Sequence, residues 1–233
     1  MNYQQFGLWD VFGNIIPGTV VMFGTASLLS EEYFSILQGG LDAGGAFFAF
    51  LLVIFSFVVG WVFQALARVI DGAMPYTKTT ISTFRDEVSN ASSGDDGINY
   101  TERYMRGAKL FFADNQADEL DNLDWELSQD LVFHMTYGHI YDNNIGRSHR
   151  FYVLMILSRS LYVAFGLTAV AHLVILLANS FIAYSPVLNP GESGAIIGIT
   201  LLSSFLMFST KDYMQRSRVK TMIGDFYRSE LTD

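Results

Sequence analysis

Apolar residues gather in four long blocks that alternate with polar segments along the chain. The most apolar block, Phe47 to Ile70, carries no charged residue before Arg68. A helix needs about 20 mostly apolar residues to cross a hydrocarbon core of roughly 30 Å. A buried helix of a soluble protein is rarely apolar on every face. We therefore predict a membrane-spanning helix over residues 46–70.

The other three apolar blocks predict three further spans. Residues 15–29 are uncharged but few, so they form either a full span or a re-entrant hairpin. Residues 161–182 form the third span, and residues 194–210 form the fourth. The fourth block is near the lower length limit, so we expect hydrophobic mismatch or a helix that continues beyond Lys211. The expected fold is an all-α membrane protein with four transmembrane helices.

The polar segments between these blocks predict the domain organisation. Residues 30–45 read as a polar loop with several glycines, and residues 185–193 read as a proline-containing turn. The long polar segment reads as a helical cytoplasmic insert between helices 2 and 3. The predicted parts are an interfacial lead-in with the first transmembrane hairpin, the insert, a second hairpin and a basic cytoplasmic tail helix, at 1–70, 71–149, 150–210 and 211–233.

Helical spacing of apolar residues supports the insert and the tail helix. One helix is expected around residues 79–89, and two more are indicated by apolar residues three or four apart. In the tail, the apolar positions recur at i, i+3, i+4, i+7 and i+8, the spacing of one buried helix face. These positions are Tyr100, Tyr104, Ala108 and Phe111, then Leu120, Leu123, Leu127 and Leu131, and in the tail Val219, Met222, Ile223, Phe226 and Tyr227.

The basic residues predict the orientation. All 14 Lys and Arg residues lie between Arg68 and Arg159 or after the fourth span. The segments 30–45 and 185–193 contain none. Basic residues near span ends stay on the cytoplasmic side. We therefore predict an integral protein of the inner (cytoplasmic) membrane, with both termini and the insert in the cytoplasm.

Composition narrows the chemistry. The chain has no cysteine and a net charge of −9, which leaves no thiol chemistry and argues against direct nucleic-acid binding. His134 and His139 are five residues apart, which does not place them on one helical face as metal ligands. Familiar enzyme motifs are also missing from the sequence. We predict no metal and no cofactor, and membrane lipids as the surroundings of the spans.

His172 is the most distinctive polar residue, because it falls near the centre of the third span. An ionisable side chain at that depth is a candidate gate, proton relay or pH sensor. The alternative is a neutral imidazole that hydrogen-bonds across helices to Ser203, Ser204 or Gln64. Other polar candidates within or beside the spans are Thr168, Gln64, Arg68, Ser204 and Asp71, where Arg68 either lines a polar vestibule or extends to lipid headgroups beside Asp71.

Small residues predict close helix packing. Gly194 and Gly198 form a G-x-x-x-G pair, a spacing that lets two spans approach closely within or between chains. Gly18 and Gly24 could serve the same purpose in the first span. The pattern favours a homo-oligomer.

The insert also carries a run of acidic residues without any basic residue between positions 110 and 146. This surface either binds cations or a soluble cytoplasmic protein partner with a basic face, or is a solvated helix face. The central acidic positions are Asp118, Glu119, Asp121, Asp124 and Glu126.

The layout of two hairpins around a helical insert resembles uncharacterised four-span membrane proteins of prokaryotes, some encoded beside antiviral defence genes. The resemblance covers the whole layout and two loose strings, IIPGTVVMFG at 15–24 and RSHRFYVLMILSRSLY at 147–162. It implies a membrane component linked to defence and identifies no functional residue.

These features favour an oligomeric, channel-like membrane effector. In this hypothesis the cytoplasmic domain senses a signal or partner and the spans alter membrane permeability. The alternatives are a membrane anchor or scaffold for a soluble partner, and a small transporter or lipid-active membrane enzyme. Transporters usually show internal repeats or broken helices at the bilayer midplane, and no convincing repeat is visible here.

Overall fold

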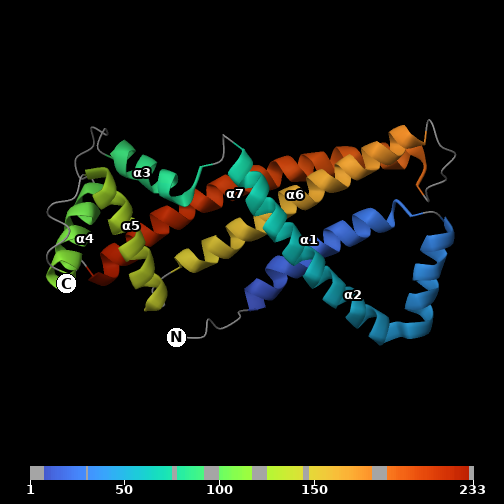
Figure 1. Ribbon diagram of the computed structural model, residues 1–233, viewed down its shortest axis with the longest axis horizontal. Coiled ribbons are helices and arrows are strands. Elements are labelled where there is room, and N and C mark those ends of the chain that lie inside the picture. Colours follow the sequence, from blue (N-terminus) through green and yellow to red (C-terminus); the bar gives the residue numbers. More distant parts are fainter. Residues whose placement is uncertain are drawn as a thin grey trace. The chain divides into compact units, whose positions relative to one another are not determined.

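The computed structural model describes residues 8–29, 31–74, 78–91, 100–116, 125–143, 147–179 and 188–230. Within these residues it contains seven helices and no strand (Figure 1). This confirms the predicted all-α fold class. The helices are α1 Leu8–Ala26, α2 Glu31–Ala73, α3 Thr80–Ala91, α4 Tyr100–Gln116, α5 Trp125–Asp142, α6 Ser148–Ala178 and α7 Pro190–Glu230.

Among the described residues, three helices are long and apolar enough to cross a membrane, so the prediction of four such spans is wrong. They are Gly44–Ala73 within α2, Ser148–Ala178 and Pro190–Glu230. The apolar part of α1, Val11–Ala26, is shorter than these. At 1.5 Å per residue it rises only about 24 Å, less than a hydrocarbon core of roughly 30 Å.

The segment before the second predicted span is helical, which corrects the expected polar loop at 30–45. α2 begins at Glu31 and is bent at Gly45, where φ is 44° and ψ is −116° (Figure 1). A positive φ is accessible to glycine because it has no Cβ. Gly45 therefore marks a kink at which two helical segments of α2 meet.

The chain forms two compact units. Unit 1 comprises Met1–Pro75 and Val153–Lys211, and unit 2 comprises Tyr76–Tyr152 and Asp212–Asp233. α6 and α7 each contribute residues to both units, and neither helix is interrupted where its residues pass from one unit to the other. The tail predicted at 211–233 thus begins as a continuation of the last apolar helix, as expected for a short fourth span.

Helix directions in unit 1 follow from residues that meet. Along α1, Asn14 lies against Gly60 of α2 and Gly18 lies against Ser56. Since the α2 numbers fall as the α1 numbers rise, the two helices are antiparallel. Gly24 of α1 lies against Thr168 of α6.

Unit 2 is held by an aromatic-rich core. α3, α4 and α5 contact one another, and the apolar stripe of α7 packs with them. Phe226 is fully buried, with its ring centroid 5.8 Å from that of Tyr104 and 5.5 Å from that of Phe112. The core contains Phe84, Val88, Tyr104, Met105, Ala108, Phe112, Val132, Phe133, Ile140, Val219, Met222, Ile223 and Phe226.

Candidate functional site

Two glycines allow α1 to lie unusually close to α2. A Cβ placed on Gly18 would overlap the carbonyl oxygen of Ser56, and a Cβ on Gly60 would overlap the carbonyl oxygen of Asn14. Backbone therefore meets backbone on both sides of this crossing, a contact that only glycine permits. Ser56 is buried and donates to the Met22 sulfur at 3.3 Å. This crossing fixes α1 against the central span.

The other side of α1 meets the polar face of α6. Thr168 is buried, and its methyl carbon lies 2.5 Å from the position that a Cβ on Gly24 would take. One turn further along α6, His172 is fully buried, and its Nε2 lies 3.1 Å from Ser27 Oγ and 3.3 Å from the Gly24 carbonyl oxygen. His172 is thus held against the end of α1, and not against Ser203, Ser204 or Gln64.

The last carbonyl groups of α1 all accept hydrogen bonds. The N–H groups of residues 27–29 bond to three carbonyl oxygens within residues 23–26 at 3.0 to 3.2 Å. The fourth, that of Gly24, accepts the Ser27 hydroxyl at 2.6 Å and faces His172. An unsatisfied carbonyl in hydrocarbon costs several kcal/mol. α1 can therefore end at the level of His172, while α6 continues to Ala178, about 9 Å further.

This network assigns the tautomer of His172. The Gly24 carbonyl can only accept, and the Ser27 hydroxyl already donates to it, so the His172 Nε2 carries the proton. Nδ1 is then an acceptor, and it is buried without a hydrogen-bond partner among the described residues. The imidazole therefore acts as a neutral donor that closes the end of α1.

A buried ion pair joins three helices at the other end of unit 1. Lys211 of α7 is 2% exposed, and its Nζ lies 3.2 Å from Asp71 Oδ1 at the end of α2. The Tyr162 hydroxyl of α6 donates to the same oxygen at 2.6 Å. The Lys211 ammonium also lies 4.6 Å from the centroid of the Phe208 ring. The pair is costly to break from the Asp71 side, because the buried ammonium charge of Lys211 would stay behind.

The remaining predicted polar residues do not join either cluster as expected. Arg68 is exposed on α2, and Asp71 pairs with Lys211 instead of Arg68. Gln64 is half-buried on the same helix. Ser204 donates to the Tyr162 carbonyl oxygen at 2.7 Å and so ties α7 to α6.

The structure describes the glycine pair that was predicted to pack between copies, but it describes little of the predicted acidic surface. Gly194 and Gly198 are exposed, and a Cβ on either would meet no atom within 4 Å. Positions 118, 119, 121 and 124 of the acidic surface lie outside the described residues, as does the side chain of Glu126. Among the residues that the structure describes, no group of three or more His, Asp or Glu is placed to hold a metal ion.

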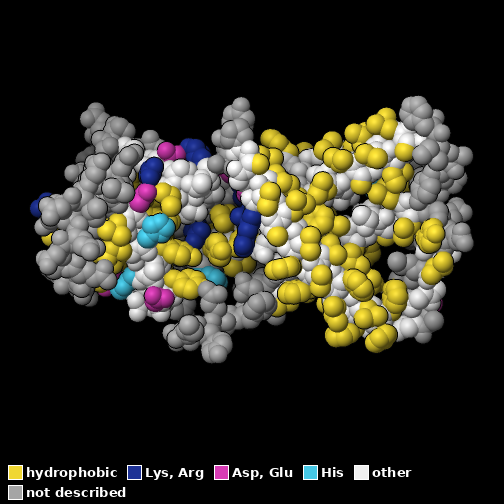
Figure 2. Space-filling model, in the orientation of Figure 1, with side chains coloured by type: hydrophobic (Ala, Val, Ile, Leu, Met, Phe, Trp, Pro, Cys, Tyr) yellow, Lys and Arg dark blue, Asp and Glu magenta, His cyan; other side chains and the backbone are white. Residues whose placement is uncertain are grey.

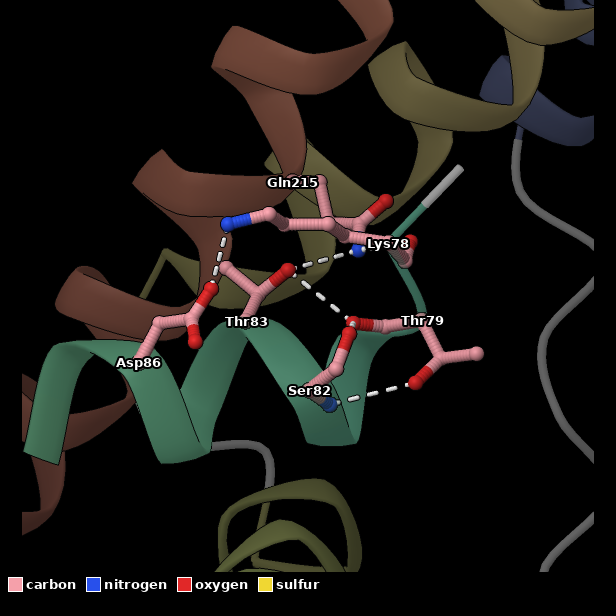
Figure 3. A network of polar contacts seen from close by, with 6 residues as sticks. All are labelled: Lys78, Thr79, Ser82, Thr83, Asp86 and Gln215. Carbon is pink, nitrogen blue, oxygen red and sulfur yellow. Dashed lines mark hydrogen bonds and ion pairs between the residues drawn. The ribbon is translucent and has the colours of Figure 1, made fainter. Parts of the chain in front are cut away.

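In unit 2, a polar network ties α7 to the start of α3 (Figure 3). Gln215 is buried and donates to the Lys78 carbonyl at 2.6 Å and to Thr83 Oγ1 at 2.8 Å. Thr79 caps α3, because its hydroxyl accepts the Ser82 N–H at 3.1 Å. The network fixes where the chain enters unit 2.

Arg218 of α7 lies between two tyrosine rings. Its guanidinium carbon is 5.0 Å from the centroid of the Tyr137 ring and 4.4 Å from that of Tyr152. The side chain is only 6% exposed. Burial lowers the pKa of Arg218, since desolvation disfavours its charge. The guanidinium links α5, the first turns of α6, and α7.

Sequence reasoning missed Ser27, Lys211, Gln215 and Arg218. Their partners lie far along the chain, up to 145 residues away for Ser27 and His172, so local patterns carry no signal for them. A lysine directly after a span and an arginine within an apolar stripe were the available hints.

Three long apolar helices with buried polar contacts between them indicate a helical membrane protein. No protein-family model, curated protein or solved structure shows significant similarity to the chain.

Proposed function

We propose that this protein is an integral membrane effector that works as an oligomer. Unit 2 lies in the cytoplasm and receives a signal or a partner, and unit 1 responds by changing the permeability of the inner membrane. α1 lies beside the three spanning helices as a short fourth element. In this proposal α1, although shorter than a hydrocarbon core, makes a fourth crossing together with the residues that follow it, so both termini face the cytoplasm.

The distribution of charge supports this orientation. Of the 14 Lys and Arg residues, eleven lie in the ranges of unit 2, and only Arg68, Arg159 and Lys211 lie in unit 1. The Asp71–Lys211 and Asp71–Tyr162 contacts bring the basic end of α2 together with the basic ends of α6 and α7. Since α1 is antiparallel to α2, α1 begins at this same end. Basic residues favour the cytoplasmic face.

The observation that carries the proposal is the continuity of α6 and α7. Each helix supplies residues to the core or polar contacts of unit 2 and, without interruption, to the apolar unit 1. A rotation or shift imposed on Asp212–Glu230 is therefore passed along the hydrogen-bonded helix to Pro190–Lys211. Helix shifts of this kind are a known form of switching.

Reconstitution tests the proposal. The purified protein in lipid vesicles should release a trapped dye or ion, with a rate that rises steeply with protein density. Inserting one alanine between Lys211 and Asp212 turns the two halves of α7 by about 100° relative to each other. We expect this insertion to change the release rate by at least about tenfold.

A seven-residue insertion at the same place is the matched control, since it adds nearly two whole turns and restores the helical phase. It should release the dye at a rate close to that of the unaltered chain. If vesicles stay tight at every protein density, with the unaltered chain and with both insertions, the proposal is contradicted and an anchor or scaffold is favoured.

A further inference from the structure

Arg218 has an unusual charge environment for a buried cation. A buried charge is normally compensated by an opposite charge, because desolvation costs several kcal/mol. Lys211 has Asp71 at 3.2 Å, and even the partly exposed Arg85 has Asp130 at 2.7 Å. For Arg218, no carboxylate of the described residues lies within ion-pair distance, and its polar neighbour is the Tyr137 side chain.

The tyrosine rings compensate only part of this charge. A ring face attracts a guanidinium through its quadrupole, typically by about 1–2 kcal/mol. The guanidinium makes a hydrogen bond with the Tyr137 side chain, and its other N–H groups suit a planar oxyanion such as carboxylate or phosphate. Arg218 therefore has unused capacity to bind an anion.

Arg218 lies beside the beginning of α6, a second feature that favours anions. Tyr152, which stacks on Arg218, is in the first turns of this 31-residue helix. The N-terminus of a helix presents free N–H groups and partial positive charge. Two N–H groups here already have partners, since Arg147 donates to Asp225 Oδ2 at 2.7 Å and Arg150 donates to the Arg147 carbonyl oxygen at 3.0 Å.

The side chains around this helix start add basic character. Arg147, His149 and Arg150 are all exposed, and the His149 ring lies 6.3 Å from the rings of both Tyr141 and Tyr152. Figure 2 shows histidine, basic and acidic side chains beside hydrophobic ones on the displayed face of unit 2.

We propose that unit 2 binds a phosphate group at the start of α6, with Arg218 as the central contact and Arg147, His149 and Arg150 around it. The phosphate belongs either to a soluble phosphorylated molecule or to a lipid headgroup. The inference deepens the proposed function by naming the ligand chemistry of unit 2, and only its role as a signal rests on that function. Binding itself is measurable without any permeability change.

Thermal unfolding of the full chain in a neutral detergent tests the site. Inorganic phosphate and ATP are titrated separately at constant ionic strength, with sodium chloride as the reference. Ligand that binds only the folded state raises Tm in a saturable way. We expect such a rise for the unaltered chain, and an apparent Kd at least about tenfold weaker for Arg218→Met.

Two variants separate binding from folding. Arg218→Lys keeps a cation between the rings and should bind more weakly than the unaltered chain but still measurably. Arg216→Met, at an exposed position on the same helix, should leave the response unchanged. A third arm measures co-flotation with phosphatidylglycerol or phosphatidylcholine vesicles in the same variants.

The outcomes are distinct. A response to soluble phosphate or ATP that depends on Arg218 supports the site with a soluble source. An Arg218-dependent preference for phosphatidylglycerol alone supports it with a lipid source. A Tm that follows ionic strength only, or equal responses in Arg218→Met and Arg216→Met, overturns the inference. Binding without vesicle leakage would contradict the proposed function but leave this site standing.

Discussion

The His172 Nε2 lies 3.3 Å from the carbonyl oxygen of Gly24, so a histidine of α6 closes the end of α1. This relationship explains why an ionisable residue is tolerated so deep in an apolar helix. The imidazole N–H donates to the Gly24 carbonyl oxygen, whose other donor is the Ser27 hydroxyl. The histidine thereby holds a helix that is too short to cross the membrane alone.

Replacing His172 should weaken the attachment of α1. His172→Leu removes the donor to Gly24, and we expect a loss of about 1 kcal/mol in the free energy of unfolding, typical of hydrogen bonds between membrane helices. His172→Gln keeps an N–H donor and should lose less than half of that. Equilibrium unfolding in mixed micelles measures both. Equal losses would show that the bond to Gly24 contributes nothing.

The crossing of α1 and α2 should not tolerate a single methyl group. Gly18→Ala and Gly60→Ala each force a Cβ into a backbone carbonyl, so we expect destabilisation by about 1–3 kcal/mol. Gly72→Ala is the control, because Gly72 is exposed on α2 with open space around it. That change should stabilise the helix slightly, by up to about 1 kcal/mol. The prediction fails if all three variants unfold alike.

The Asp71–Lys211 pair should show strong coupling. Lys211→Met removes the cation beside the half-buried Asp71 carboxylate, which keeps its hydrogen bond from the Tyr162 hydroxyl, and it should cost about 3 kcal/mol. Adding Asp71→Asn should recover part of that loss, since the charge of the carboxylate is then removed together with that of the ammonium. Unfolding of both single variants and of the double variant gives the coupling energy.

The control for this cycle is the exposed ion pair of unit 2. Lys220 is 66% exposed beside Glu87, at 3.5 Å. Lys220→Met should change the free energy of unfolding by no more than about 0.5 kcal/mol, because solvent screens the pair. A purely additive result for Asp71 and Lys211 would mean that their contact adds no stability.

Local patterns predicted the parts of the fold that depend on neighbouring residues. The stripe from Val219 to Tyr227 recurs at helical spacing, and all of it except the partly buried Tyr227 is buried in the core of unit 2. That His172 lies within an apolar helix followed from its position in an apolar block. Its partner Ser27 did not, because their contact depends on where α1 ends, and apolar length alone left the full span and the re-entrant hairpin open.

Local sequence patterns also did not predict which charged residue is buried. Lys211 follows the fourth apolar block, so sequence reasoning placed it with the exposed basic residues of the tail. In the structure it is buried against Asp71, since α7 continues past the apolar block and packs there. The burial of a charge depends on tertiary packing, which hydropathy does not encode.

Unit 2 should lose stability in acid through Asp130. Arg85 donates to both carboxylate oxygens, at 3.0 and 2.7 Å, and this lowers the pKa of Asp130. A carboxyl whose folded pKa is lowered stabilises the fold above its unfolded pKa of about 3.9 and loses that effect as pH falls through the folded value. Partial exposure limits the effect to about 1 kcal/mol or less.

Arg85→Met tests this. The difference in unfolding free energy between the unaltered chain and the variant should be constant from about pH 5 to 7 and shrink below about pH 4. Thermal unfolding in detergent across this range measures it. A difference that does not change with pH would show that the pair does not perturb Asp130.

The exposed glycines of α7 test the oligomer. Gly194 and Gly198 are exposed, and a Cβ on either meets no atom within 4 Å, so Gly194→Leu and Gly198→Leu should leave the folded protomer intact. If α7 packs on a second copy through these glycines, leucine blocks the close approach that they permit, and dissociation should become at least about tenfold easier. Mass measurement of the detergent-extracted protein over a range of concentrations detects the shift toward monomer. Gly72→Leu, on an exposed part of α2, controls for added bulk and should leave the mass unchanged; an unchanged mass in all three variants would place the contact between copies elsewhere.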